Sequence, residues 1–200
     1  MLNKNILKCL GFVLLMLTLA PRAFADTIFL VANEDEAQHL QPLESDSRRI
    51  IIIGEGRSNV IRTLTAKIKD GMIKADDTII NVGYVGAKGI EKGEIVKVSK
   101  VSLYLPSKTV QENPIELNML SANFHQEDGF TAENFITADD ERVAELPEKC
   151  VIDMELYYIA LMLPEVMSVK IVSDSLNFEE YQQANFAESW EMVIRELEKL

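Results

Sequence analysis

Short apolar runs alternating with polar, helix-like segments dominate the pattern of this sequence. Residues 27–32 (TIFLVA), 49–54 (RIIIIG), 78–82 (TIINV) and 167–172 (MSVKIV) are each of strand length and rich in aliphatic side chains. Continuous apolar strands of this kind are buried on both faces, as they are in a sheet covered by helices. The pattern therefore predicts an α/β domain with a largely buried sheet.

Between and after these strands, apolar positions recur at helical spacing. Residues 58–69 fit a helix, and the segment that starts at Phe178 places Tyr181 and Trp190 near one helical face. We expect this last segment to form one amphipathic closing helix, with its aromatic side chains in the core. Residues 94–105 alternate well enough to predict a longer pair of strands.

The first 25 residues have the layout of a secretory signal peptide. A basic start precedes an apolar run over residues 10–20, and residues 23–25 (AFA) have the small-x-small pattern of a cleavage site. The run is too short for a stable membrane span, and an uncleaved anchor is the alternative. We expect residues 1–25 to be removed and residues 26–200 to form a single domain, secreted or periplasmic and free of the membrane.

The mature chain is strongly acidic. Loss of Lys4, Lys8 and Arg22 with the leader leaves 17 of the 20 basic residues against 32 acidic ones, a net charge of −15. Because phosphate binding needs a basic surface, this balance argues against nucleic acid as a partner.

Cysteine and histidine offer little chemistry. Cys150 is the only cysteine of the mature chain, so no intramolecular disulfide can form and the core alone must hold the domain. It precedes an apolar strand, and we interpret it as a small buried side chain, not as a nucleophile. Only His39 and His125 accompany it, so the sequence predicts no metal site, and no cofactor is implied.

Carboxylates follow three of the predicted apolar segments. Glu34-Asp35-Glu36 comes after the first strand, Glu155 stands at the start of an apolar helix, and Asp174 leaves the last strand. Each has a plain structural interpretation as well, because acids favour the first turn of a helix and both Ser173 and Asp174 are good N-caps.

Taken in order, five segments resemble motifs of the bacterial 5′-methylthioadenosine/S-adenosylhomocysteine nucleosidases, which are part of the purine nucleoside phosphorylase superfamily. They are residues 29–37 (FLVANEDEA), 79–86 (IINVGYVG) with 92–96 (KGEIV), 131–136 (TAENFI), 151–155 (VIDME) and 169–174 (VKIVSD). The resemblance covers most of residues 27–200 and implies a nucleoside phosphorylase/hydrolase-like fold, a three-layer α/β/α domain around a mixed central sheet.

The resemblance also implies a homodimer. The region from Ser102 to Asp128 is shorter than the family's corresponding stretch, which leaves the oligomeric state open. Residues 106–128 are polar and irregular, and they predict a loop with at most a short helix.

The resemblance assigns the catalytic pair and the ribose contacts. Glu36 would be the base that activates water, and Asp174 would be the acid that protonates the purine at N7. Met154 and Glu155 would hold the ribose, since the two carboxylate oxygens of Glu155 can accept hydrogen bonds from its hydroxyls. Ser173, directly before the acid, would border the substrate.

The remaining assigned residues are aromatic or permit a close approach. Phe135 would stack on the purine while the backbone of Ile136 hydrogen-bonds to it, although Phe135 alone is equally consistent with a core residue. Gly83 and Gly86 would let the backbone come close to the ligand, although two glycines alone usually mark a turn. Tyr84, between them, stands where the family carries a small or hydroxyl residue.

These roles predict hydrolysis of the N-glycosidic bond of a purine nucleoside such as 5′-methylthioadenosine or S-adenosylhomocysteine, with release of adenine. The chemistry needs one acid and one base with separated pKa values, so burial must raise the pKa of Asp174 while Glu36 stays ionised beside water.

Two alternatives remain open. A purine nucleoside phosphorylase needs cations for phosphate, and only Arg57 is a candidate, since Lys170 replaces the family's usual arginine. A catalytically degraded nucleoside-binding protein is suggested by Tyr84, which would crowd the ribose, and by the short stretch over residues 102–128.

Overall fold

A computed structural model describes residues 25–104 and 114–200. The leader expected over residues 1–25 lies, apart from Ala25, outside these residues. The helices and strands, in chain order, are β1 (Thr27–Val31), α2 (Glu34–Leu40), η1 (Gln41–Leu43), β2 (Arg48–Ile52), α3 (Gly56–Lys69), β3 (Thr78–Lys88), β4 (Ile95–Tyr104), β5 (Ile115–Glu116), β6 (His125–Ala132), η2 (Glu141–Glu145), β7 (Cys150–Asp153), α4 (Leu156–Met162), β8 (Met167–Asp174), α5 (Phe178–Gln182) and α6 (Ala187–Leu197). None of the helices in the described residues is both long and apolar enough to cross a membrane.

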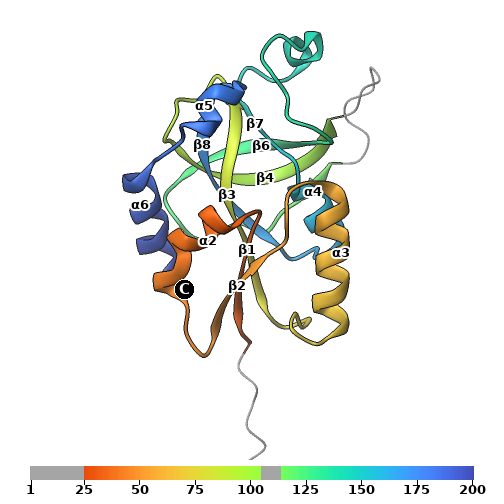
Figure 1. The fold of residues 1–200 in the computed structure, drawn as a ribbon, viewed down its shortest axis with the longest axis vertical. Coiled ribbons are helices and arrows are strands. Elements are labelled where there is room, and N and C mark those ends of the chain that lie inside the picture. The colour runs from red at the N-terminus through yellow and green to blue at the C-terminus, as the bar shows by residue number, and fades with distance from the viewer. Residues whose placement is uncertain (1–24, 105–113) are drawn as a thin grey trace, which may run out of the picture.

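Eight strands form one mixed sheet (Figure 1). β1 lies between β2 and β3, and these three strands are parallel. β8 runs parallel to β3 on one side and antiparallel to β4 on the other. β4 then pairs with β6, β6 with β7, and β7 with β3. The strands β3, β8, β4, β6 and β7 therefore close a ring, from which β1 and β2 extend as an open sheet.

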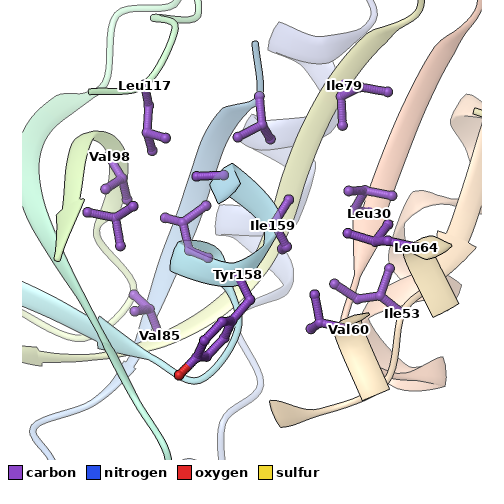
Figure 2. Close-up of a cluster of buried hydrophobic side chains, with 14 of the residues drawn as sticks. Leu30, Ile53, Val60, Leu64, Ile79, Val85, Val98, Leu117, Tyr158 and Ile159 are labelled. Carbon is purple, nitrogen blue, oxygen red and sulfur yellow. The ribbon is translucent and has the colours of Figure 1, made fainter. Parts of the chain in front are cut away.

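Helices cover both faces of the open sheet, with α3 and α4 on one side and α2 and α6 on the other (Figure 1). Successive side chains of β1 point to opposite faces of the sheet, so each face needs a covering layer. Leu30 lies in the same buried cluster as Val60 of α3 and Ile159 of α4, as Figure 2 shows. Its neighbour Phe29 points the other way and joins a second cluster with Trp190 of α6. The three-layer α/β/α architecture expected from the sequence is confirmed.

The third predicted strand is longer than expected. β3 continues through Gly83 and Gly86 to Lys88, and neither of these glycines has a positive φ. The turn that two glycines suggest is therefore wrong. Glycine is needed at both positions for a steric reason, because side chains from neighbouring elements occupy the space where a Cβ would lie.

Two other expectations need correction. Residues 94–105 supply one long strand, β4, instead of a pair, and the described part of the predicted loop contains β5 and the start of β6. The predicted single closing helix is two helices, α5 and α6. α6 buries Trp190 against the sheet, whereas no residue of α5 is buried, so the two helices serve different surfaces.

Cys150 is the first residue of β7 and has no exposed surface. Burial raises the pKa of its thiol to about 11. The thiolate is the reactive form of cysteine, and a raised pKa disfavours it. Cys150 is therefore an unreactive core side chain, as the sequence indicates.

Candidate functional site

A cavity of about 270 Å³ opens where β1, β3, β7 and β8 meet α5. Eight of the ten residues that the sequence assigns to the site line it. The residues around it are Ala32, Asn33, Glu36, Glu55, Tyr84, Val85, Gly86, Asn134, Phe135, Ile152, Asp153, Met154, Glu155, Ser173, Asp174, Phe178 and Tyr181. Strand ends supply most of them, which is where ligands bind in open α/β sheets.

Glu36 reaches this cavity from the first turn of α2. The Asn33 side chain caps that helix by accepting a hydrogen bond from the Glu36 backbone N–H, at 3.1 Å. The Glu36 carboxylate is 4% exposed and accepts hydrogen bonds from two backbone N–H groups, that of Ala32 at 2.7 Å and that of Tyr84 at 2.8 Å. The acidic turn is thus a favourable helix start and also a means of holding one carboxylate in the cavity.

Opposing influences act on the Glu36 carboxyl. Burial raises its pKa, and the Lys170 ammonium and the backbone hydrogen bonds pull it back toward the ordinary range. The net direction is upward because burial penalises the charged form more than these partners favour it. Each carboxylate oxygen still has a lone pair free for a further donor.

Asp174 is the last residue of β8 and is 1% exposed. The Ser173 hydroxyl lies 2.6 Å from Oδ2, and the Asn177 backbone N–H donates to Oδ1 at 3.1 Å. The same Ser173 hydroxyl lies 3.1 Å from the carbonyl oxygen of Val85. Burial raises the pKa of Asp174 despite these hydrogen bonds.

The two glycines of β3 lie beside these two carboxylates. A Cβ on Gly83 would come within 2.5 Å of Glu36 Oε1, and one on Gly86 would come within 3.0 Å of Asp174 Oδ1. Gly83 itself does not line the cavity. Its place in the site is therefore to leave room for Glu36.

Glu155 is the N-cap residue of α4 and is 7% exposed. Its Oε1 accepts a hydrogen bond from the Gly56 backbone N–H, 2.7 Å away at the start of α3. Burial and the nearby Asp153 carboxylate raise the pKa of Glu155 to about 7. Met154, which precedes it, also lines the cavity.

Asp153, which lines the cavity, forms a buried ion pair with Lys170, which does not. Lys170 Nζ lies 3.2 Å from Asp153 Oδ2, and both side chains are 4% exposed. Asp153 also accepts hydrogen bonds from the Thr131 hydroxyl at 2.6 Å and from the Leu156 backbone N–H at 3.0 Å. The ammonium of Lys170 lowers the pKa of Glu36 and so favours the charged form of that side chain. The sequence shows Lys170 at an arginine position but gives no sign of its partner.

Aromatic side chains form one wall. Phe135 lies edge-on to Phe178, with 5.2 Å between the ring centroids, and 5.9 Å from the ring of Tyr181. We expected the aromatic residues of the closing segment to lie in the core, and for Phe178 and Tyr181 this is wrong. The break between α5 and α6 frees α5 to lie over the cavity, whereas Trp190 of α6 is buried.

Ile136 and Tyr84 border the cavity differently from their neighbours. Ile136 lines a recess of about 30 Å³ that shares Phe135, Gly86 and Asp174 with the main cavity. The Tyr84 hydroxyl accepts a hydrogen bond from the indole N–H of Trp190 at 2.8 Å. This bond ties the tyrosine side chain to α6.

The candidate phosphate ligand lies elsewhere. Arg57 does not line the cavity; its Nη1 lies 3.4 Å from Glu133 Oε1, and its guanidinium lies 5.6 Å from the ring centroid of Tyr158. Among the described residues, no lysine or arginine lines the cavity, and no group of three histidine, cysteine or acidic side chains could hold a metal ion.

No protein-family model matches the chain, and no curated protein matches its sequence. Solved structures do match its fold. The 5′-methylthioadenosine/S-adenosylhomocysteine nucleosidase of Neisseria meningitidis, solved with methylthio-immucillin-A, has a TM-score of 0.70 at 17% identity, over 88% of this chain and 100% of that one. The corresponding Helicobacter pylori enzyme has a TM-score of 0.70 at 10% identity, and the match covers 90% of this chain and 100% of that one.

The futalosine hydrolase of Helicobacter pylori gives a TM-score of 0.68 at 11% identity, over 88% of this chain and 99% of that one. All three neighbours are in the nucleoside phosphorylase/hydrolase superfamily. The three matches cover nearly the whole of each neighbouring chain. The chain has the fold of the nucleoside phosphorylase/hydrolase superfamily, as the sequence motifs indicate.

Proposed function

We propose that this protein hydrolyses the N-glycosidic bond of a purine nucleoside such as 5′-methylthioadenosine or S-adenosylhomocysteine and releases adenine. One observation carries the proposal: two separately held, buried carboxyl groups, Glu36 and Asp174, line a single cavity with Glu155 and the aromatic wall around Phe135. An acid, a base, a ribose ligand and a stacking surface are the four parts that this reaction needs.

In the proposed reaction Asp174 is the acid. Its raised pKa favours the protonated form, and transfer of that proton to the purine would stabilise the departing base. Burial is the main cause of the raised pKa, and the Ser173 hydroxyl holds the carboxyl group in place. As the bond to the purine breaks, positive charge develops on the ribose.

Glu36 is the proposed base. Two backbone N–H groups fix its carboxylate, so the remaining lone pairs can orient a water molecule toward the sugar. A raised pKa makes the carboxylate a stronger base, and the charge of Lys170 helps to keep it ionised. Glu155 accepts hydrogen bonds from the ribose hydroxyls, and Phe135 packs on the purine.

Hydrolysis is favoured over phosphorolysis by the charge of the cavity. Glu36, Glu55, Asp153, Glu155 and Asp174 line it, whereas no basic side chain of the described residues does. A phosphate dianion would be repelled by the carboxylate of Glu36, which is ionised in its proposed role as base, and water would not. Arg57 is held at Glu133 and Tyr158 instead of in the cavity.

The test is adenine release from 5′-methylthioadenosine and S-adenosylhomocysteine by the purified protein, with and without phosphate. We expect release in phosphate-free buffer and its loss in Asp174→Asn and Glu36→Gln. Glu34→Gln, which changes an exposed acid in the same helical turn, is the matched control and should remain active. A strict phosphate requirement would favour a phosphorylase, and binding of nucleosides without turnover would favour a binding protein.

A further inference from the structure

The proposed roles leave one part of the cavity unassigned. In the proposed complex Phe135 and Asp174 contact the purine, and Glu155 contacts the ribose hydroxyls. Among the lining residues that have no role, Asn33, Glu55, Asn134 and Tyr181 carry polar groups, and Asn134 directly precedes Phe135 on the purine side. Because the 5′ carbon is the remaining exit from the ribose ring, a 5′ substituent would meet Asn33, Glu55 and Tyr181.

Glu55 lies close to the proposed ribose contact. It is the N-cap residue of α3, and the next residue, Gly56, donates the backbone hydrogen bond that holds Glu155. The Asn33 side-chain amide donates to Glu55 Oε1 at 3.2 Å, which ties the glutamate to the start of α2. Within the described part of the chain, Glu55 forms no ion pair and its Oε2 has no hydrogen-bond donor.

A second cavity of about 360 Å³ adjoins the first. The two share Asn33, Tyr84 and Tyr181. The other residues around the second cavity are Asp35, Gln38, His39, Gln182, Ala184 and Asn185. This surface is almost entirely polar, so an extended apolar substituent would find little to pack against there.

Neither cavity offers a fixed positive charge in the described residues. No lysine or arginine lines either one. His39 lies in the second cavity, stacked on Trp190 with 4.6 Å between the ring centroids, and burial lowers its pKa below 6.5. Burial therefore favours the neutral form of the imidazole. Asp35 and Glu55 remain as the carboxylates on the path of the 5′ substituent.

We propose that Glu55 determines substrate charge: the site prefers purine nucleosides with a positively charged 5′ substituent and disfavours those with an anionic one. This inference rests on the proposed function, because it takes the position of the nucleoside from it. An ammonium on the 5′ carbon would meet the free Oε2 of Glu55 in a charge-assisted hydrogen bond. A 5′-phosphate would meet the same oxygen with repulsion and without any compensating cation.

The test compares two nearly isosteric substrates, adenosine and 5′-amino-5′-deoxyadenosine, in which a hydroxyl is replaced by an amine that is protonated at neutral pH. We expect kcat/KM of the parent protein to favour the amine by about three- to tenfold, because Glu55 is exposed and solvent weakens the interaction. High salt should reduce the preference. Glu55→Gln should abolish it, and Glu34→Gln should keep it.

Adenosine 5′-monophosphate is the anionic probe. We expect the parent protein to hydrolyse it far less well than adenosine, and Glu55→Lys to narrow that gap. An equal amine-to-hydroxyl ratio in the parent and in Glu55→Gln would overturn the inference and leave the proposed function standing, provided that adenosine is hydrolysed.

If neither nucleoside is hydrolysed, the same pair is compared by calorimetric binding. Tighter binding of the amine that is lost in Glu55→Gln upholds charge selection, and the assay with 5′-methylthioadenosine then decides the hydrolase activity. Equal binding in both proteins overturns the selection. Absence of any binding overturns both proposals.

Discussion

The carboxylate of Glu36 occupies the space in which a side chain on Gly83 would lie, 2.5 Å from the position of a Cβ. Strand β3 and helix α2 meet at this point, and the backbone N–H of the next residue, Tyr84, donates to the same oxygen. The glycine is thus required by a neighbouring side chain and not by its own backbone dihedral angles.

Gly83→Ala should displace Glu36 and reduce kcat of nucleoside hydrolysis by about 100-fold, the lower end of what general acid–base catalysis contributes. Gly86→Ala should have a smaller effect, because its Cβ would lie 3.0 Å from Asp174 Oδ1 and needs a smaller shift. Steady-state kinetics with circular dichroism as a folding check measures both. Equal, small losses in the two variants would contradict the assigned position of Glu36.

Ser173→Ala tests the proposed acid through the pH profile. The Ser173 hydroxyl lowers the pKa of Asp174, so its removal should raise that pKa further. Because a general acid is active only while protonated, the fall in kcat at rising pH should move to higher pH in the variant. A pH profile that keeps its alkaline limb in place would show that Asp174 is not the group that controls it.

Glu155 predicts a pH dependence of stability. Its pKa is about 7 in the folded protein against 4.5 for the ordinary side chain, so between these values the folded state binds more protons than the unfolded state. The free energy of unfolding should therefore fall as the pH rises from about 4.5 to 7, by roughly 3 kcal/mol from this group.

Urea unfolding of the parent and of Glu155→Gln at pH 4.5 and pH 8 measures that contribution. The variant cannot titrate at this position, so it should lose less stability over the interval than the parent protein. The difference between the two proteins removes the contribution of other groups. Parallel stability curves would mean that Glu155 does not carry the raised pKa.

Lys170→Met should destabilise the protein by about 3–5 kcal/mol, because it leaves the Asp153 carboxylate buried without its counter-ion. Lys100→Met is the matched control: Lys100 pairs with Asp128 at 3.0 Å, but the side chains are 41% and 34% exposed, and such surface pairs contribute about 0–1 kcal/mol. Adding Asp153→Asn to Lys170→Met should recover part of the loss. Equal costs for the two lysines in urea unfolding would contradict this account.

The strands that the sequence predicts best are those buried on both faces. β1 and β8 read as continuous apolar runs because the sheet is covered on each side, and the structure places them within two residues of the predicted bounds. β3 was predicted too short because local patterns assign paired glycines to turns. In the structure both glycines lie within the strand, where they leave room for the side chains of Glu36 and Asp174 from other segments.

In the candidate site, too, the sequence reveals residues in local motifs and misses those brought in by distant segments. Glu36, Glu155 and Asp174 stand out in sequence because each follows a strand in a recognisable motif. Glu55 and Tyr181 carry no such signal, and they reach the cavity only because α3 starts beside Glu155 and α5 lies over the strand ends. The partner of Lys170 is equally hidden, since a pair joining β7 and β8 depends on how the sheet closes.

The pairing of β8 on both sides, within the ring of five strands, constrains the site in a way that an edge strand could not. A slip of β8 by one residue along β3 would turn Asp174 to the opposite face, away from the cavity. If β8 were an edge strand, such a slip would have to break the hydrogen bonds of one strand pair only. Here β8 is also paired with β4, so both sets of hydrogen bonds would have to break together. The alignment of Asp174 with Glu36 is therefore locked by strand pairing on two sides, independently of any bound ligand.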